Sequence, residues 1–519
     1  MKNKSALTIF VLCLAIAIEP LTAQTQSSID YSIKFSEEIS DQVQKDGRLF
    51  IFFSNNSRRE PRTQTWPTPG MSNIIFAKNY SDIKPQSSFE IGSSETWVST
   101  SDMKINAIKP GRYYVQALWD QDTSESRISA PGNLYSDVLE LTISAENKID
   151  LVIAKSIPER SEIEHELVRW VDMKSDTLSS WWGKDMFLKA SILLPSNYDA
   201  KKSYAIRYNV AGYGGRYTRI SRLVRSNRFM DWWASEEAPE VITVFLDGEG
   251  PFGDSYQMDS ENSGPYGYAL INELIPFIEK QYRGTTDPLE RFVDGCSTGG
   301  WVSLGLQLYY PDVFNGVFSY SPDAIEFENY QLINIYKDEN AFVNEYGYDR
   351  PVWRETSGEP VMSLRDFINY ENVLGYSNTY VTSGGQFSAH TALYSPKGDD
   401  GLPKPLFDPE SGDIDKEVAD HWKKYDFKLY ASENWSELGP AVAGKIYLWM
   451  GDMDNFYLNP ASRSFAQWLE STDNPKSDAV IEFTATAGHC TQFSNTKVLE
   501  QIKKRLSDVI VLASTSSGM

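Results

Sequence analysis

An α/β fold built on a mostly parallel sheet, preceded by an all-β region, is predicted from two patterns in this 519-residue chain. Residues 28 to about 155 contain short runs of alternating apolar and polar residues, broken by Pro, Gly and Asn, which is typical of a β-sandwich. From about residue 185, strand-like runs alternate with helical ones, which indicates a sheet covered by helices. The length also exceeds what one core usually serves, so two domains are expected.

The first residues predict export. Lys2 and Lys4 precede an apolar run over residues 6–18, and Ala23 is a small residue that suits cleavage. The run is shorter than the roughly 20 residues that a membrane-spanning helix needs. We therefore expect a cleaved signal peptide over residues 1–23 and a secreted or periplasmic protein with no membrane span.

Behind this leader, the pattern divides the chain into two expected domains. Residues 24–155 form an Ig-like β-sandwich that serves as an accessory domain, and residues 156–519 form the catalytic domain. The net charge of −22 argues against nucleic acid or an anionic membrane as a partner.

The catalytic domain carries a clear series of strand-like runs. The expected strands are residues 187–194, 204–210, 241–246, 291–294, 317–320, 446–450 and 480–486. A helix over residues 266–282 would place Leu270, Leu274, Phe277 and Ile278 on one face, and residues 461–469 predict another helix.

One long segment interrupts this alternation. Residues 324–440 are rich in Tyr, Asn, Asp and Gly and lie between two predicted strands. A structureless loop of that length is uncommon in a compact domain. We expect an inserted cap over the active-site end of the sheet; the alternative is a peripheral excursion remote from the site.

The sequence Gly295-Cys296-Ser297-Thr298-Gly299 predicts a nucleophile. It follows a strand-like run and precedes a run that can continue as a helix, which is the context of the nucleophile elbow in an α/β-hydrolase sheet. The flanking glycines relieve the steric conflict of so sharp a turn. The backbone N–H of Thr298, at the start of the helix, is expected to point toward an oxyanion.

A serine nucleophile needs a base and an orienting acid. His489 follows the last predicted strand, and the chain order Ser, acid, His matches this fold. Asp454 is the favoured acid because it lies beyond the end of the preceding strand. Asp452 remains an alternative and, more distantly, so does Asp323.

Two further features complete the predicted site. The glycine-rich turn over residues 210–215 should supply the second oxyanion donor, assigned to the N–H of Tyr213 and less firmly to that of Gly212. Cys296 directly precedes the predicted nucleophile, and Cys490 directly follows the predicted base. If Ser297 and His489 approach each other, a Cys296–Cys490 disulfide is geometrically plausible in an oxidising compartment.

The order Cys-Ser, Asp, His-Cys resembles the tannase and fungal feruloyl esterase family, whose flanking cysteines pair. Residues 273–279 and the Gly212-Tyr213-Gly214 turn resemble the esterase D and enterochelin-esterase group, which often has an N-terminal β-sandwich. This resemblance implies a serine esterase with a cap between nucleophile and acid.

These observations together predict an exported serine carboxylic-ester hydrolase that acts through an acyl-enzyme on an acylated carbohydrate or a phenolic ester. The alternatives are a serine peptidase with the same triad and a non-catalytic glycan-binding protein on a hydrolase scaffold. No metal or organic cofactor is required by this chemistry. Asp408, Asp413 and Asp415 lack a complete calcium-loop pattern and are expected to be turn carboxylates.

Overall fold

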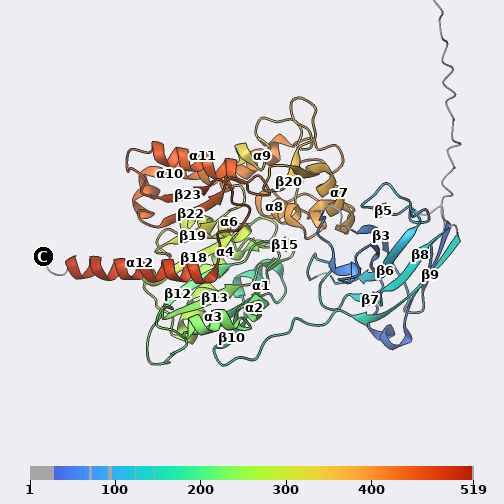
Figure 1. Ribbon diagram of the computed structural model, residues 1–519, viewed down its shortest axis with the longest axis horizontal. Coiled ribbons are helices and arrows are strands. Elements are labelled where there is room, and N and C mark those ends of the chain that lie inside the picture. The colour runs from blue at the N-terminus through green and yellow to red at the C-terminus, as the bar shows by residue number, and fades with distance from the viewer. Residues whose placement is uncertain (1–27, 69–72, 92–95, 123, 145, 517–519) are drawn as a thin grey trace, which may run out of the picture.

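The computed structural model describes residues 28–68, 73–91, 96–122, 124–144 and 146–516. The predicted signal peptide, residues 1–23, lies outside the described residues. Figure 1 shows two large β-sheets, one N-terminal and one in the C-terminal part of the chain, with helices of the inserted segment lying beside both. No helix in the described ranges combines the length and apolarity needed to cross a bilayer.

The N-terminal strands form one nine-stranded sheet in the order β4-β1-β9-β7-β6-β2-β3-β5, with β8 paired to β6. The strands are β1 Ser28–Phe35, β2 Gly47–Ser54, β3 Ile74–Tyr80, β4 Ser88–Ile91, β5 Val98–Ser99, β6 Gly111–Asp120, β7 Leu134–Ser136, β8 Leu139–Ile143 and β9 Glu146–Ser156. Apolar residues of β1 and β9 pack with residues of β2 and β6 in a single core. The predicted β-rich N-terminal region is therefore present.

Strand β2 is buried on both of its faces. Leu49, Ile51 and Phe53 alternate into the core of the N-terminal sheet. Phe50 and Phe52 point the other way and pack against the helix α7 (Leu364–Leu374). The N-terminal sheet is thus joined to the inserted segment by an apolar contact.

The second sheet has the order β10-β11-β13-β12-β18-β19-β22-β23 and is called the hydrolase sheet below. Its strands are β10 Val168–Lys174, β11 Phe187–Leu193, β12 Ala205–Val210, β13 Val241–Leu246, β18 Arg291–Cys296, β19 Val317–Tyr320, β22 Ile446–Gly451 and β23 Val480–Thr484. The seven predicted strands are all present with ends within two residues. The pairs from β13 to β23 are parallel, whereas β10 and β11 form an antiparallel edge.

Helices cover both faces of the hydrolase sheet, as the α/β-hydrolase prediction requires. One face is covered by α5 (Ile275–Tyr282), α6 (Thr298–Tyr309), α10 (Phe427–Ala441) and α11 (Asn459–Ser471). The other face is covered by α2 (Ile220–Val224), α3 (Asn227–Trp233) and α12 (Asn495–Ser516). A short helix α1 (Asp176–Trp182) follows β10.

The predicted helix over residues 266–282 contains a π turn that the periodicity did not indicate. It runs as α4 (Tyr266–Ala269), a π turn over Leu270–Leu274 and then α5. A π turn shifts the following residues by one position. Ile278 and Glu279 are therefore buried, and the predicted core residue Phe277 is 40% exposed.

The inserted segment, residues 324–440, contains several helices and a hairpin and is not a structureless loop. It contains α7, α8 (Gln386–Tyr394), α9 (Lys416–Trp422), most of α10 and the hairpin β20 (Pro351–Arg354) and β21 (Pro360–Ser363). Two smaller hairpins precede it, β14–β15 (Glu249–Gly250 and Gly253–Asp254) and β16–β17 (Asp259–Ser260 and Gly264–Pro265). In Figure 1 the helices α7 and α8 lie between the two large sheets.

Candidate active site

Ser297 occupies a sharp turn between a strand and a helix. β18 ends at Cys296 and α6 begins at Thr298, so the serine is the single residue between them. Its φ of 60° and ψ of −129° form a backbone conformation that a residue with a Cβ rarely adopts. The Ser297 N–H donates to the Tyr320 carbonyl of β19 at 3.0 Å, which ties the turn to the neighbouring strand.

The two glycines of the motif are required by close packing. A Cβ at Gly299 would lie 2.3 Å from the carbonyl oxygen of Val210. A Cβ at Gly295 would lie 2.4 Å from the carbonyl carbon of Gly299. The helix therefore starts in direct contact with the end of β12, and a larger residue at either position would displace Ser297.

A buried ion pair anchors the strand that leads to the serine. Arg207 on β12 donates to both carboxylate oxygens of Asp294 on β18, at 2.6 and 2.7 Å, and both side chains are fully buried. Asn209 donates a further hydrogen bond of 2.9 Å to Asp294. These contacts fix the two central strands beneath the turn, since a bidentate pair restricts both side chains.

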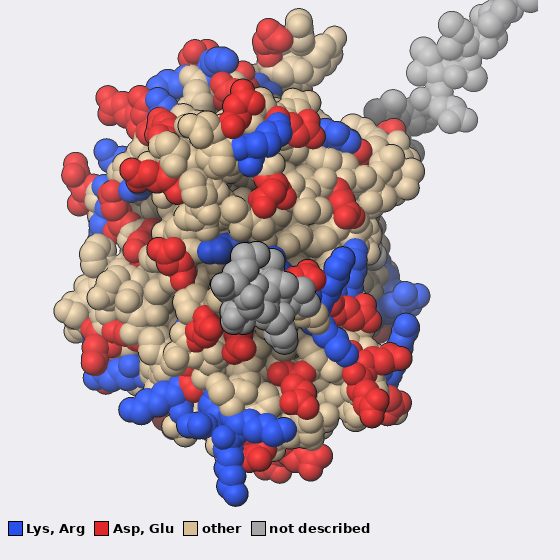
Figure 2. Space-filling view, turned by 90° about the vertical axis from the view of Figure 1, so that its left-hand side faces the viewer, with Lys and Arg blue, Asp and Glu red and all other residues tan. Residues whose placement is uncertain are grey.

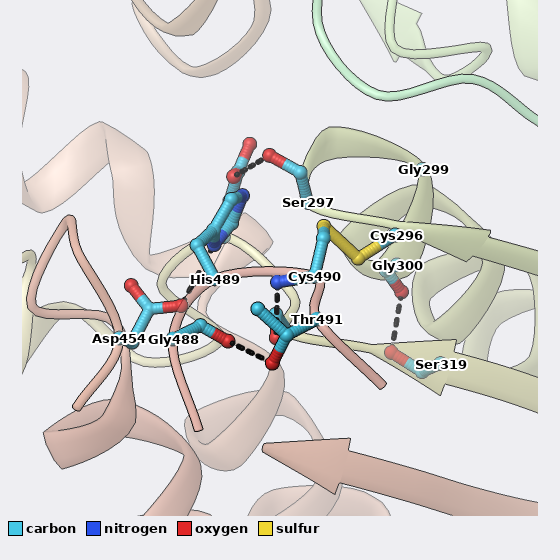
Figure 3. Close-up of a disulfide and its surroundings, with 12 residues drawn as sticks. Cys296, Ser297, Gly299, Gly300, Ser319, Asp454, Gly488, His489, Cys490 and Thr491 are labelled. Atoms are coloured by element: carbon cyan, nitrogen blue, oxygen red, sulfur yellow. Dashed lines mark hydrogen bonds and ion pairs between the residues drawn. A yellow bond between two sulfur atoms is a disulfide. The ribbon is translucent and has the colours of Figure 1, made fainter. Parts of the chain in front are cut away.

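The predicted Cys296–Cys490 disulfide is present, with the two Cα atoms 5.9 Å apart. Figure 3 shows that it joins the residue before Ser297 to the residue after His489. Cys490 also donates its backbone N–H to Ser321 Oγ at 3.2 Å. The loop that carries His489 is therefore fixed to the turn that carries Ser297.

Removing this disulfide is expected to destabilise the protein strongly. The bond closes a loop with a sequence separation of 194 residues. The Cys296→Ala/Cys490→Ala variant should lose about 3–5 kcal/mol of unfolding free energy, because the unfolded chain gains conformational freedom. Urea denaturation would measure this loss. Wild-type protein in reductant should match the variant; equal midpoints for the oxidised wild type and the variant would contradict the expectation.

His489 contacts one of the candidate acids. Its Nδ1 lies 2.7 Å from Oδ2 of Asp454, whose side chain is fully buried. Asp454 Oδ1 also accepts the Phe456 N–H at 2.9 Å, which orients the carboxylate. Asp452 instead forms a bidentate pair with Arg463, at 2.7 and 2.5 Å. Of the two aspartates after β22, the structure therefore places Asp454 against the imidazole.

Ser297 has a different partner from the one that the sequence led us to expect. Its Oγ donates to Oδ1 of Asp323 at 3.4 Å. Among the described residues, no hydrogen bond joins Ser297 to His489. Figure 3 nevertheless shows the imidazole between Asp454 and Ser297. Hydrogen bonds between catalytic groups are often long before substrate binds, and rotation of the serine side chain changes the direction of Oγ.

Asp323 is the centre of a buried polar network that the sequence only partly indicated. Its Oδ2 accepts from Tyr256 at 2.8 Å and from Thr298 Oγ1 at 2.9 Å. His390 Nε2 lies 3.5 Å away, and Gln386 donates at 3.2 Å. Burial raises the pKa of Asp323, but the hydrogen bonds and the charge of His390 outweigh it and hold the pKa below its usual range. A carboxylate anion therefore lies beside Ser297.

His390 and Gln386 come from α8 of the inserted segment. His390 is buried, and its Nδ1 lies 2.6 Å from the Tyr330 hydroxyl. The sequence gives one signal for His390, namely its position in the inserted segment. Gln386 and Tyr256 had none, because hydrogen bonds between distant segments leave no local pattern.

The two segments that carry the predicted oxyanion donors both lie next to the serine. The N–H of Thr298 is the first of α6, where N–H groups have no partner within the helix. A Cβ built on Gly212 would lie 3.6 Å from Ser297 Cβ, so the glycine-rich turn lies directly against the serine. The Tyr213 hydroxyl donates to the Gly384 carbonyl, and this contact holds the turn against the inserted segment.

A cavity of about 440 Å³ opens beside Ser297 and is lined mainly by apolar side chains. These side chains are Trp66, Val352, Phe367, Phe387, Phe456 and Leu458. Trp66 belongs to the N-terminal region and packs edge-to-face against Phe367 and Phe456, with ring centroids 5.3 and 6.3 Å apart. Phe456 in turn lies edge-on to His489 at 5.0 Å. Trp66, Phe367 and Phe456 come from three parts of the chain and form one aromatic wall of the cavity.

The acidic residues 408–415 of the inserted segment accept hydrogen bonds from backbone N–H groups of their own turn and of the next helix. Asp408 accepts the N–H groups of Glu410 and Ser411, at 2.9 and 2.7 Å, and Asp415 is the N-cap of α9. In the described ranges, no group of three or more His, Cys, Asp or Glu residues is arranged to hold a metal ion.

A model of the esterase family described as "Putative esterase" matches residues 183–508, which is more than half of the chain. The chain belongs to this esterase family. It is a serine ester hydrolase with an α/β-hydrolase sheet, and the predicted resemblance to a family of esterases is confirmed.

Solved structures that this esterase resembles are distant from it. A ferulic acid esterase is 17% identical, with a TM-score of 0.41, covering 65% of this chain and 98% of its own. An S-formylglutathione hydrolase from Agrobacterium tumefaciens is 12% identical, with a TM-score of 0.41, covering 67% of this chain and 98% of its own. A ferulic acid esterase from Anaeromyces mucronatus is 13% identical, with a TM-score of 0.33, covering 67% and 92%.

The family match begins after the N-terminal sheet, at residue 183. Trp66 nevertheless lines the cavity beside Ser297. The N-terminal region of this esterase therefore contributes a side chain to the site, although it lies outside the part of the chain that defines the family.

Proposed function

We propose that Ser297 is the nucleophile of an exported carboxylic-ester hydrolase, with His489 as its base and Asp454 as the orienting acid. The contact between Asp454 and His489 Nδ1 is the observation that carries this assignment, because it leaves Nε2 of the imidazole for the serine proton. The disulfide supports it by holding His489 close to the nucleophile turn. Export is supported by the predicted signal peptide and by the disulfide, since such bonds persist in oxidising compartments.

The reaction follows from these positions. Ser297 Oγ turns from Asp323 toward His489, gives its proton to Nε2 and attacks the ester carbonyl carbon. The N–H groups of Thr298 and Tyr213 stabilise the oxyanion, and Asp454 stabilises the imidazolium. His489 then protonates the leaving alcohol, and an acyl-enzyme forms. Water attacks this ester with His489 again as base, which releases the acid and restores the serine.

The substrate class is an acylated carbohydrate or a phenolic ester. The aromatic wall of Trp66, Phe367 and Phe456 supports this choice, because flat rings and sugar faces stack on aromatic side chains. Within the described ranges, the inserted segment and the N-terminal region both line the cavity that contains Ser297. We propose that the inserted segment acts as the cap of the site.

A panel of esters tests this function. The full chain should hydrolyse 4-nitrophenyl acetate and aryl or feruloyl esters, and should leave a peptide library intact. Trp66→Ala should raise KM for a feruloyl ester about three- to tenfold through lost stacking, with kcat for 4-nitrophenyl acetate unchanged. Trp181→Ala is the matched control, because Trp181 is 51% exposed and lies outside this cavity. Inactivity on every ester, or cleavage of peptides instead, would overturn the proposal.

The pH dependence of kcat/KM should depend on Asp323. Burial lowers the pKa of His489, but the charges of Asp454 and Asp323 and the hydrogen bond to Asp454 outweigh it, so the pKa is raised. His489 acts as a base only when neutral, so activity is lost as pH falls through this raised pKa. Asp323→Asn removes one of the raising charges and should move the acidic limb to lower pH. A pH–rate profile measures the shift; an unmoved limb would contradict it.

A further inference from the structure

A second cleft, of about 780 Å³, lies beside the glycine-rich turn and is lined by five arginines. They are Arg160, Arg216, Arg219, Arg222 and Arg225. Among the described residues, no Asp or Glu lines this cleft. The chain as a whole carries a net charge of −22, so this concentration of positive charge runs against its overall composition. Figure 2 shows Lys and Arg side chains gathered at the lower end of the face that it presents, among acidic side chains elsewhere on that face.

The arginines of the cleft recur at every third position. Arg216, Arg219, Arg222 and Arg225 follow one another with this spacing through α2 and the helical turn before it. Residues three apart lie on the same side of a helix. The local fold therefore turns a regular sequence pattern into one basic surface.

Only part of this positive charge is neutralised. Arg160 pairs with Glu125, and Arg216 pairs with Asp247 and Glu249. Arg219 donates to the Leu246 carbonyl and to the carbonyl and side-chain oxygens of Asn209, which are all neutral.

Three of the arginines have no carboxylate in contact. Within the described ranges, no carboxylate lies within ion-pairing distance of Arg219, Arg222 or Arg225. Arg222 and Arg225 are exposed to solvent. Burial lowers the pKa of Arg219 to about 10, and the charge of Asp247 only partly opposes this. The cleft thus holds guanidinium groups that lack a counter-ion.

The cleft adjoins the site described above. Gly212 lines both the basic cleft and the cavity that contains Ser297. Cys296, the residue before Ser297, and Phe493, which follows the His489 loop, also line the cleft. A ligand that extends across the glycine-rich turn would reach from the serine to the arginines.

We propose that this cleft binds an anionic oxygen-bearing group, a carboxylate, sulfate or phosphate, carried by the ester substrate. Planar guanidinium groups donate paired hydrogen bonds to such groups and stay charged at working pH. The substrate is then an ester of an acidic saccharide or of a similarly charged alcohol. This assignment to the substrate rests on the proposed esterase function, whereas binding of the anion itself does not.

Calorimetry with sodium sulfate tests the cleft directly, with sodium chloride at matched ionic strength as the blank. Arg222→Ala/Arg225→Ala should weaken sulfate binding about tenfold or more, since each charge-assisted hydrogen bond is worth at least a factor of ten. Arg228→Ala is the matched control, because Arg228 continues the same spacing and lies outside the cleft. Absence of sulfate binding to the wild type, or equal binding by the double variant, would overturn the site.

Kinetics then identify the source of the anion. An acetylated uronic acid disaccharide is compared with the same disaccharide after reduction of its carboxyl groups to alcohols. The double variant should raise KM about tenfold for the acidic ester alone, from the same hydrogen bonds. Equal KM changes for both esters would overturn the assignment to substrate and leave a site for a free ion. Activity on 4-nitrophenyl acetate reports separately on the esterase itself.

Discussion

The Ser297→Ala variant is expected to lose nearly all hydrolysis of 4-nitrophenyl acetate, with kcat about 10⁴- to 10⁶-fold lower. The serine is the single residue between β18 and α6, it lines the cavity, and Figure 3 shows it beside the imidazole of His489. Alanine keeps the backbone and removes the attacking oxygen. The folded structure, the disulfide and substrate binding should all persist.

Two measurements make this expectation decisive. Rapid-mixing kinetics should show a burst of 4-nitrophenol in the wild type and none in the variant, because no acyl-enzyme can form. Ser432→Ala is the control, since Ser432 is an exposed serine on α10 away from the cavity. A variant at position 297 that retained more than a few per cent of kcat would show that another residue is the nucleophile.

Replacing Asp454 with asparagine should be the next most damaging change. Asp454 is the carboxylate that contacts His489 Nδ1, at 2.7 Å. Asparagine retains the size but can favour the wrong imidazole tautomer, so kcat should fall about 10³- to 10⁴-fold. The pKa of His489 should also fall, because Asp454 is the larger of the two nearby charges that raise it.

The matched control lies two residues away. Asp452→Asn removes a carboxylate of the same loop that pairs with Arg463 instead of the histidine. Its kcat should stay within about threefold of wild type, since a surface ion pair contributes little. Steady-state kinetics on both variants would decide between them. A larger loss from Asp452→Asn than from Asp454→Asn would reverse the assignment.

The hydrolase sheet was predictable because its central strands are buried on both faces. Such strands read as continuous apolar runs, as in Val241–Leu246 and Val317–Tyr320. β10 escaped prediction because it is an antiparallel edge strand, and Val168 and Val171 are its only buried residues. The π turn over Leu270–Leu274 was also not predicted, because one extra residue in a helical turn leaves the amino-acid composition of the segment unchanged.

The candidate site was predictable where chemistry depends on a local motif. Ser297 is framed by glycines that steric contacts require, and the two cysteines adjoin the residues that they hold together. Asp323 was only a distant alternative for the acid, and it contacts the serine rather than the histidine at hydrogen-bonding distance. The place of Trp66 beside Ser297 depends on tertiary contacts among distant segments, which a one-dimensional pattern does not report. The three-residue spacing of Arg216, Arg219, Arg222 and Arg225 is visible in the sequence, but the cleft that they line is not.

The double-sided burial of β2 has a consequence for how this chain can be divided. Arg48 on β2 is fully buried and donates to the Val373 carbonyl and to Asn378, at 3.0 and 2.9 Å. Phe50 and Phe52 beside it cover Tyr370 and Leu374 of α7. A truncated enzyme that starts after Ser156 would expose the apolar face of α7 to water. It would also lack Trp66, which lines the cavity beside Ser297. The N-terminal region is thus needed to bury an apolar surface of the catalytic part, and we expect that it cannot be removed without loss of stability.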